Sequence, residues 1–245
     1  MVMPAELPVG PAVDSAPARF PGTVTLRGRT GAVERLSAAR HRAALWTAMR
    51  GHDAIWAYLP AGPFADQAAF DTYIGECEQN KDRIFYAVID AGGRAVGILS
   101  LMEIRPAMRV IEVGNIVYSP ALQRTPLATE AQYLIACYAF ETLGYRRYEW
   151  KCNALNAASK RAAERFGFTY EGLFRQHMIV KGRSRDTAWF SMLDSEWPAR
   201  KAAFEKWLSP DNFGPDGRQK TSLAALNGVK VDRARGTSAG HRRRS

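Results

Sequence analysis

The stretch of residues 109–152 constrains the fold of this chain more than any other part of it. A strand-like run ends at Tyr118-Ser119-Pro120, the segment QRTPLATE (residues 123–130) follows, and an apolar helix then leads to a second strand-like run at 146–152. Two strands joined by a helical crossover pair in parallel. The sequence therefore predicts an α/β sheet layered by helices.

The helix after QRTPLATE has a well-marked beginning. Its apolar positions repeat with the period of a helix that packs on one face, at Leu127, Ala131, Leu134, Ile135 and Tyr138. Thr125 suits the N-cap and Pro126 the first helical position. Such a helix presents the N–H groups of Leu127, Ala128 and Thr129 and a partial positive charge to whatever precedes it, which suits a pyrophosphate. An ordinary capped amphipathic helix has the same pattern.

Turn residues and periodicity predict the remaining elements. The expected strands and helices are a strand at 23–27, helices at 32–49 and 64–78, a hairpin of 83–90 with 94–103, a strand at 109–118, a helix to about 143, a strand at 146–152, a helix at 156–166 and a final hairpin of 168–180 with 185–193. Gly167 is expected as the left-handed cap of the helix at 156–166.

The order and spacing of these elements resemble a known family. A strand, a phosphate-facing helix, a strand, a helix led by Asn156 and a strand opened by Gly167-Phe168 resemble the cofactor half of the GNAT superfamily, the acyl-CoA-dependent N-acyltransferases. The resemblance covers about residues 21–200 and is greatest to the branch that acetylates N-terminal amines of ribosomal proteins, whose loop reads Q-G-K-G-x-x-T-E. It implies a mixed, mostly antiparallel twisted sheet with helices on both faces and a splayed parallel strand pair that forms the acyl-CoA cleft.

The resemblance also implies a reaction. An acetyl group passes from acetyl-CoA, the cosubstrate, to a primary amine by direct attack on the thioester, without a metal. The acceptor is a protein N-terminal amine or a small-molecule amine. Two alternatives stay open: a sensor that binds acyl-CoA without turnover, and an RNA-associated binding module.

The family pattern assigns the cofactor contacts to two stretches. Gly114 suits the bulge that opens the gap between the parallel strands. Backbone groups of Asn115, Ile116 and Val117 would then meet the pantetheine amides and the thioester oxygen. The residues expected at the phosphates are Gln123, Arg124, Thr125, Leu127, Ala128 and Thr129. Pro126 stands where the family has its second loop glycine and removes one N–H donor, so the Arg124 side chain is expected to help.

Amide formation needs an amine without its proton, and two residues are candidates for the base. Glu112 lies eleven residues before Gln123, a spacing similar to that of the glutamate base in the histone-modifying branch. A glutamate that faces solvent or pairs with an arginine is the alternative. His177 competes because its ordinary pKa lies near 6.5. Met178 occupies the position where ribosomal-type members carry an acid, so the base stays open.

The departing thiolate needs a proton donor. Ala163 stands where other branches have a tyrosine, so that acid is absent. Asn156 and Ser159 match the N-x-x-S pattern of the ribosomal branch, and Ser159 is expected to donate to the thiolate as well as to contact the cofactor. An N-cap role for Asn156 and a first-turn position for Ser159 are the plain structural alternatives.

The acceptor side is the least determined part of the sequence. It is expected to include Trp46, Trp56, Tyr58, Phe64, Arg175, His177, Arg183 and Trp189 around two helices and the turn at Lys181-Gly182. Aromatic residues at these spacings are equally typical of a core. Asp186 after the turn matches the ribosomal branch, or it is only a charge at the start of a strand.

Composition predicts the organisation of the chain. Residues 1–20 are rich in Pro, Ala and Val without periodicity and are expected to be a disordered leader, residues 21–208 an acetyltransferase domain, and residues 209–245 a disordered tail. That tail has eight Lys or Arg against three Asp. It could contact RNA or another polyanion weakly, or it has no partner.

Three cysteines without a C-x-x-C motif, Cys77, Cys137 and Cys152, favour a reducing, cytoplasmic location. No apolar run approaches the ~18 residues of a membrane span, so no membrane partner is expected. The chain is expected to be a monomer or a homodimer.

Overall fold

The computed structural model describes residues 9–229 of the 245-residue chain. The chain divides into two compact units, residues 1–149 and 150–245. Strand β6 (Arg147–Asn153) begins in the first unit and ends in the second.

The first unit is built on an ordered run of strands. These are β1 (Thr25–Arg27), β2 (Gly31–Arg35), β3 (Ile84–Asp90), β4 (Ala95–Arg105), β5 (Val110–Tyr118) and the start of β6, neighbours in that order. The pairs from β1 to β5 are antiparallel, and β5 with β6 is parallel. The expected mixed, mostly antiparallel sheet with a parallel strand pair is therefore confirmed.

The parallel pairing of β5 with β6 covers few residues. It joins Val110 to Arg147, Ile111 to Tyr148 and Glu112 to Glu149, and β5 runs on to Tyr118 beyond the last of these pairs. Because residues paired directly across neighbouring strands point to the same face of a sheet, Glu112 and Glu149 share a face.

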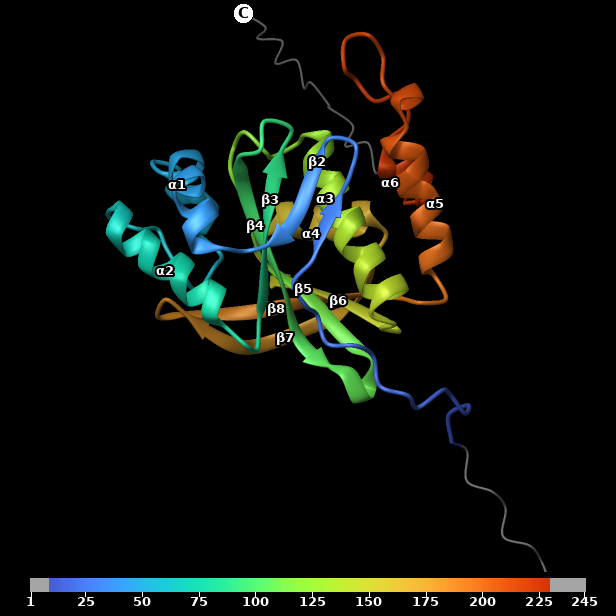
Figure 1. The fold of residues 1–245 in the computed structure, drawn as a ribbon. Coiled ribbons are helices and arrows are strands. Elements are labelled where there is room, and N and C mark those ends of the chain that lie inside the picture. Colours follow the sequence, from blue (N-terminus) through green and yellow to red (C-terminus); the bar gives the residue numbers. More distant parts are fainter. Residues whose placement is uncertain (1–8, 230–245) are drawn as a thin grey trace, which may run out of the picture. The chain divides into compact units, whose positions relative to one another are not determined.

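Helices α1 (Ala38–Met49) and α2 (Gln67–Gln79) form the core of the first unit with β3 and β4. Figure 1 shows them side by side next to these strands. Asp66 caps α2 by accepting a hydrogen bond from the Ala69 N–H at 2.9 Å. Their inward residues pack in one buried cluster with strand residues, which includes Leu45, Met49, Trp56, Phe70, Ile74 and Phe85. Short 3-10 turns lie at Asp53–Trp56 and Pro106–Met108.

The expectation of one helix over residues 32–49 is wrong at its beginning. Residues Gly31–Arg35 form β2, and the helix starts at Ala38. Val33 is fully buried and pairs with Leu26 on one side and Val88 on the other. Helix-forming residues such as Ala32 and Glu34 therefore adopt a strand because tertiary pairing outweighs local propensity.

Helix α3 (Pro126–Cys137) continues into a π-helical turn at Tyr138–Thr142, close to the expected end near 143. Thr125 is its N-cap and Pro126 its first residue, as the sequence predicts. The far end of the QRTPLATE segment has a structural role: buried Glu130 accepts hydrogen bonds from the Arg29 and Thr30 N–H groups at 2.8 and 2.7 Å. This carboxylate holds the turn between β1 and β2.

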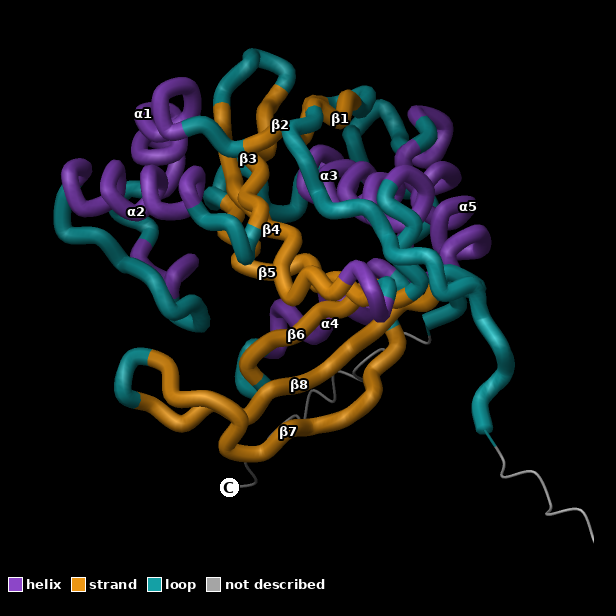
Figure 2. Tube along the Cα trace, turned by 60° about the horizontal axis from the view of Figure 1, so that its bottom comes forward, coloured by secondary structure: helices purple, strands orange, loops and turns teal. Residues whose placement is uncertain are grey.

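The second unit consists of the end of β6, a hairpin and helices. Its elements are α4 (Ala157–Phe166), β7 (Thr169–Val180), β8 (Arg183–Leu193), α5 (Trp197–Leu208), a 3-10 turn at Pro210–Asn212 and α6 (Leu223–Leu226). Strand β8 lies between β6 and β7, and β7 pairs with β8 in antiparallel fashion around Lys181-Gly182. Figure 2 shows this long hairpin as two adjacent strands. Gly167 ends α4 in the left-handed conformation expected of it, with φ +92°.

The predicted boundary of the basic tail at residue 209 is wrong for its first part. Residues 210–229 include α6, and Leu223 is fully buried. Asn227 donates from Nδ2 to the Arg165 carbonyl at 3.0 Å, and Arg200 donates to the Asn227 carbonyl at 3.1 Å. Burial of Leu223 and the hydrogen bonds of Asn227 thus hold this polar segment in a defined structure. Residues 230–245 of the tail lie outside the described residues.

The last residues of the leader expected over residues 1–20 are bound to the folded chain by backbone hydrogen bonds. Residues 1–8 lie outside the described part of the chain, and 9–17 are exposed. Ala18 is buried and donates its N–H to the Pro106 carbonyl at 3.1 Å, and the Arg19 N–H donates to the Leu143 carbonyl at 2.8 Å. The first unit therefore includes residues 18–20.

Candidate active site

A bulge interrupts β5 where the sequence predicts one. Ser100 pairs with Gly114 and Ile98 with Val117, so one residue of β4 faces both Asn115 and Ile116. Asn115 has φ +48°, in the left-handed region that asparagine tolerates better than most residues. The left-handed residue of the bulge is thus Asn115, one position after the glycine.

The absence of a side chain at Gly114 lets Met102 and Glu112 pack close to the backbone at this bulge. A Cβ at this position would lie 2.5 Å from Met102 Sδ and 3.4 Å from Glu112 Oε1. Asn115 Nδ2 donates to Ser100 Oγ at 3.1 Å, and Ser100 Oγ donates to the Gly114 carbonyl at 3.1 Å. Ser100 is fully buried, so this chain of hydrogen bonds fixes the backbone on which the pantetheine contacts are predicted.

Glu112 is a buried carboxylate on the same strand, with 5% of its surface exposed. The alternative of a glutamate that faces solvent does not fit this burial, whereas its role as the base stays a prediction. Its parallel neighbour Glu149 is buried as well, and is bound by Arg147 at 2.7 Å and by Arg105 at 3.2 Å. Two carboxylates thus lie on one face of the parallel pair, and the charge of Glu149 is offset by two arginines.

A cavity of about 290 Å³ reaches Asn115 from the side of α2. Its lining residues are Leu59, Pro60, Ala61, Tyr73, Glu76, Cys77, Asn80, Arg83, Phe85 and Asn115. Tyr73, Glu76 and Asn80 lie on one face of α2 and the turn that follows it, since they are three and four residues apart. The cavity has a carboxylate and a guanidinium, and Asn115 of the bulge lines it. Sequence reasoning missed Glu76 and Arg83; the helical spacing gave a signal for Glu76 but not for Arg83, which lies beyond the end of α2.

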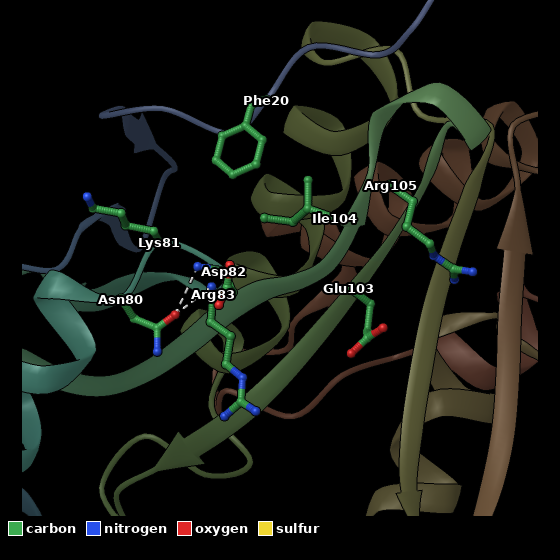
Figure 3. A pocket seen from close by; sticks show the side chains of 8 residues that line it. All are labelled: Phe20, Asn80, Lys81, Asp82, Arg83, Glu103, Ile104 and Arg105. Atoms are coloured by element: carbon green, nitrogen blue, oxygen red, sulfur yellow. Dashed lines mark hydrogen bonds between the residues drawn. The ribbon is translucent and has the colours of Figure 1, made fainter.

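A second cavity of about 480 Å³ shares Asn80 and Arg83 with the first. Figure 3 shows its other lining residues, which are Phe20, Lys81, Asp82, Glu103, Ile104 and Arg105. Asn80 Oδ1 accepts hydrogen bonds from the Asp82 and Arg83 N–H groups at 3.0 and 2.8 Å and so shapes the turn between the two cavities. Arg83 and Glu103 point to the same side in Figure 3. The walls therefore offer charges of both signs.

Not every backbone N–H group expected at the phosphates is available at the start of α3. Thr125 Oγ1 accepts the N–H of Ala128 at 3.2 Å, so this predicted donor already has a partner. Gln123 is exposed, and its Nε2 donates to the Tyr118 carbonyl at 2.9 Å. Leu127, Ala128 and Thr129 are buried in the first turn of α3.

Arg124 precedes the helix and is exposed, with φ +63°. An arginine held in the left-handed conformation directly before a helix N-terminus presents a cation where the helix dipole also favours an anion. These groups fit the diphosphate of an acyl-CoA: a charged side chain supplies what the capped backbone lacks.

In the second unit, Asn156 and Ser159 have defined partners. Asn156 caps α4 by accepting the Ser159 N–H at 3.0 Å, which confirms its N-cap role. Ser159 Oγ accepts a hydrogen bond from Trp150 Nε1 at 3.0 Å. A hydroxyl that accepts such a bond becomes a better donor of its own proton. Ala163 is fully buried in α4, so its methyl group belongs to the core.

His177 lies on exposed β7 beside an irregular stretch of the strand. Phe174 pairs with Thr187 and Met178 with Arg185, so residues 175–177 face Asp186 alone. Asp186 accepts the Gln176 N–H at 2.6 Å and thereby holds this bulge, which gives it a role beyond a charge at a strand start. His177 Nδ1 lies 3.0 Å from Thr187 Oγ1, in an open hollow lined by residues 174–177.

The aromatic residues expected at the acceptor side have different surroundings. Trp56 is buried and makes edge contacts with Phe64 and Tyr73 at centroid distances of 5.1 and 5.8 Å, so this part of the set belongs to the core. Tyr58 is exposed. The ring of Trp189 packs at a tilt against Phe174, with the ring centroids 4.4 Å apart. Lys151 Nζ lies 4.1 Å from the centroid of the Trp189 ring.

The cysteines have the surroundings of structural thiols. All three are free; Cys77 and Cys152 are buried. Burial raises the pKa of Cys77 to about 11 and also raises the pKa of Cys152. Both therefore stay protonated near neutral pH and are poor nucleophiles. Within residues 9–229, no cluster of His, Cys, Asp and Glu is arranged to hold a metal ion.

The arrangement of strands, bulge and capped helix defines a class of protein. Residues 33–169 match the family model of the acetyltransferase (GNAT) domain. The chain belongs to the GNAT acetyltransferase family, an acyltransferase class of enzymes.

Particular relatives extend this assignment along the chain. A crystal structure of a GCN5-related N-acetyltransferase from Brucella melitensis is 46% identical, with a TM-score of 0.86 over 88% of this chain and 99% of that one. A probable acetyltransferase of the GNAT family from Chromobacterium violaceum is 44% identical, with a TM-score of 0.74 over 80% of this chain and all of that one.

A curated relative from Bacillus subtilis bears the name "Putative ribosomal N-acetyltransferase YdaF". It is 30% identical over 117 residues, which are 46% of this chain. The match spans 63% of that relative's length. Among the helices of residues 9–229, none has the length and apolar character needed to cross a membrane.

Proposed function

We propose that this chain transfers an acetyl group from acetyl-CoA to a primary amine by direct attack of the amine on the thioester. The observation that carries this proposal is the bulge at Asn115. It lies on the part of β5 that runs beyond the parallel register, close to buried Glu112, and Asn115 lines a cavity. Family membership supports acetyl-CoA as the cosubstrate.

The pantetheine arm is assigned to β5. Residues 115–117 lie beyond the last paired position of the parallel register and include the bulge. A bulge turns backbone groups away from the regular ladder and makes them available to a ligand. We assign the amide contacts and the thioester oxygen contact to Asn115, Ile116 and Val117.

The phosphates are assigned to the start of α3. Arg124, Gln123 and Thr125 precede or begin the helix, and the N–H groups of Leu127, Ala128 and Thr129 belong to its first turn. Because Thr125 already binds the Ala128 N–H and Pro126 has none, we assign the largest single contribution to the Arg124 guanidinium.

The chemistry needs two proton movements. Acetyl-CoA supplies an acyl group on a thiolate leaving group. As the N–C bond forms and the C–S bond breaks, Glu112 accepts the proton of the amine, directly or through water. Ser159, whose oxygen already accepts the Trp150 N–H, donates a hydrogen bond to the thiolate, which takes its proton from water. We retain His177 as the competing base because an imidazole can accept the proton of an amine.

The acceptor amine is assigned to the cavity that ends at Asn115. Its Glu76 carboxylate attracts an ammonium group before the proton is lost, and Tyr73 forms part of the wall. The second cavity begins at the shared residues Asn80 and Arg83. A small amine fills only the first cavity, whereas a protein N-terminus continues into the second. We therefore favour a protein N-terminal amine as the acceptor, in line with the word "ribosomal" in the name of the Bacillus subtilis relative.

We also favour a cytoplasmic location, in line with the free cysteines.

A sensor that binds acyl-CoA without turnover is the second candidate. Two observations favour it: the Ala128 N–H is engaged by Thr125, and Pro126 lacks an N–H. An RNA-associated role of the basic tail rests mainly on residues 230–245, which lie outside the described residues.

An acetyl-CoA thiol-release assay across small amines and N-terminal peptides, with calorimetric titration of acetyl-CoA beside it, separates these candidates. The enzyme releases thiol with at least one amine class, and peptides exceed small amines in kcat/KM if both cavities are used. Binding without release from any acceptor favours the sensor. The absence of both binding and release contradicts the proposal.

A further inference from the structure

Strand β7 is an edge strand with an unusual surface. It is the last strand in the order β6–β8–β7 of the second unit, and ten of its twelve residues are exposed. Its large exposed apolar side chains are Tyr170, Leu173, Phe174, Met178 and Ile179, the last with 83% of its surface exposed. Soluble proteins usually protect such edges, because a long apolar edge strand is a template for another chain.

The sequence of β7 is symmetric in polarity about Gln176. Two apolar residues, Leu173-Phe174, precede the polar centre Arg175-Gln176-His177, and two more, Met178-Ile179, follow it. Acidic Glu171 lies five positions before Gln176, and basic Lys181 lies five positions after it. Such a strand is complementary to itself when it is turned end to end.

We propose that two copies of this chain associate through β7, in antiparallel orientation about a two-fold axis at Gln176. In a two-fold interface residue i meets residue j of the other copy, and j meets i. Leu173 then faces the partner's Ile179, Phe174 faces the partner's Met178, and Glu171 faces the partner's Lys181. Directly opposed residues of antiparallel strands point to the same face, so each pair makes contact.

The apolar side chains supply roughly half of the area that a standard dimer interface buries. Five large side chains that are roughly half exposed present on the order of 400–500 Å² of surface per copy. The strand backbone and the polar centre add to this area, and a standard interface buries about 800 Å² per partner.

The bulge of β7 shapes this interface. Residues 175–177 depart from the register with β8, and Gln176 has φ +50°. A continuous ladder of hydrogen bonds between two copies would be interrupted there, so the contacts form through side chains on either side of the axis. The open hollow of about 700 Å³ lined by residues 174–177 lies at the axis, and the second copy covers it. Candidate base His177 then lies next to the partner's Arg175.

Sedimentation of the full chain at 1–100 μM tests the association. We expect a species of twice the 27.2 kDa chain mass that dissociates on dilution. Ile179→Lys, at a solvent-exposed position, weakens the dimer about tenfold or more because it places a charge against an apolar partner. Leu155→Lys is the matched control: Leu155 is 79% exposed in the same unit but outside β7, so dimerisation is unchanged.

A charge exchange tests the register. Lys181→Glu alone weakens the dimer because two carboxylates face each other, and the double variant Glu171→Lys with Lys181→Glu restores it. A circular dichroism spectrum and melting temperature like those of the wild type show that each variant is folded. A wild-type monomer at 100 μM overturns the proposal. A dimer that Ile179→Lys leaves intact, or one that the double variant fails to restore, overturns the β7 register.

Discussion

Glu112 and His177, the two candidate bases, differ in chemistry and in surroundings. Glu112 is buried on β5 beside Gly114 and Met102, whereas His177 lies on the exposed face of β7 within reach of the Thr187 hydroxyl. A buried carboxylate close to a bulge is positioned for a proton that leaves a bound amine. The hollow beside His177 is lined by only four residues, 174–177.

We expect Glu112→Gln to lower kcat by about 10² to 10⁴, the usual range for a general base, with acetyl-CoA affinity nearly unchanged. The substitution keeps the size of the side chain and removes its ability to accept a proton. Steady-state kinetics and calorimetric titration measure the two effects. The acidic limb of the pH–rate profile should disappear with the carboxylate.

Two further variants control this experiment. His177→Ala should leave the acidic limb in place, and Glu149→Gln removes a neighbouring buried carboxylate whose oxygens bind Arg105 and Arg147. Folding of both is checked by thermal unfolding. If kcat survives in Glu112→Gln and collapses in His177→Ala, the histidine is the base.

Substitution of Arg124 by glycine removes a charge without adding backbone strain. Its φ of +63° is readily adopted by glycine, so we expect Arg124→Gly to keep the stability of the wild type and to weaken coenzyme A binding by ~1–3 kcal/mol, the scale of a charge-assisted hydrogen bond. Calorimetric titration measures this loss. Binding of a pantetheine fragment should stay the same, and equal losses for both ligands would show that Arg124 does not meet phosphate.

At the scale of elements, α1 depends on a buried histidine at its start. His41 Nδ1 accepts the Ser37 N–H at 3.0 Å, so the ring proton lies on Nε2, which donates to Glu34 Oε1 at 2.8 Å. Arg40 and Glu78 also lie near this ring. Burial, the largest effect, lowers the pKa of His41 from its ordinary value of 6.5.

The stability of the chain should therefore fall as the pH drops below about 6.5. In that range the unfolded chain binds a proton at residue 41 that the folded chain still excludes, and the loss ends at the lowered pKa of the folded state. Urea unfolding at pH 7.5 and 5.5 measures it. His41→Gln should reduce the decline, whereas His52→Gln, at an exposed histidine, should retain it. The same decline in all three proteins contradicts this linkage.

Elements with strong local signals were predictable from the sequence. The N-cap at Thr125, the cap at Gly167 and the turn at Lys181-Gly182 follow from side-chain chemistry within a few residues. Strand β2 was not, because its conformation depends on pairing with a strand about fifty residues away. In the candidate site, the strand that carries Glu112 was predictable from its pattern, whereas the cavity residues Glu76 and Arg83 meet Asn115 only through tertiary packing.

At the scale of the whole molecule, the segment after α5 belongs to the folded chain. Leu223 of α6 is fully buried, and Asn227 bridges the backbone of Arg165 and the side chain of Arg200. Removal of residues 209–245 would therefore remove part of a core together with the basic charges. The last sixteen residues, 230–245, carry six Lys or Arg and one Asp.

We expect truncation after residue 208 to destabilise the chain and truncation after 229 to leave its thermal unfolding unchanged. Leu223→Ala should cost ~2–5 kcal/mol, as for other buried leucines, whereas Leu155→Ala, at an exposed position, should cost little. Denaturant unfolding measures each loss. The chain ending at 229 is also the suitable partner for a nucleic-acid binding comparison, because a stable 1–208 fragment is not expected.

The bond between Glu130 and the β1–β2 turn has a consequence for the order of folding during synthesis. The carboxylate binds the Arg29 and Thr30 N–H groups across about a hundred residues of chain. The turn of the first hairpin thus stays without this partner until α3 has left the ribosome. Because such distant contacts form late, we expect the amino-terminal hairpin to stay unprotected against hydrogen exchange in nascent chains that end before Glu130, and to become protected once residue 130 is free to fold back.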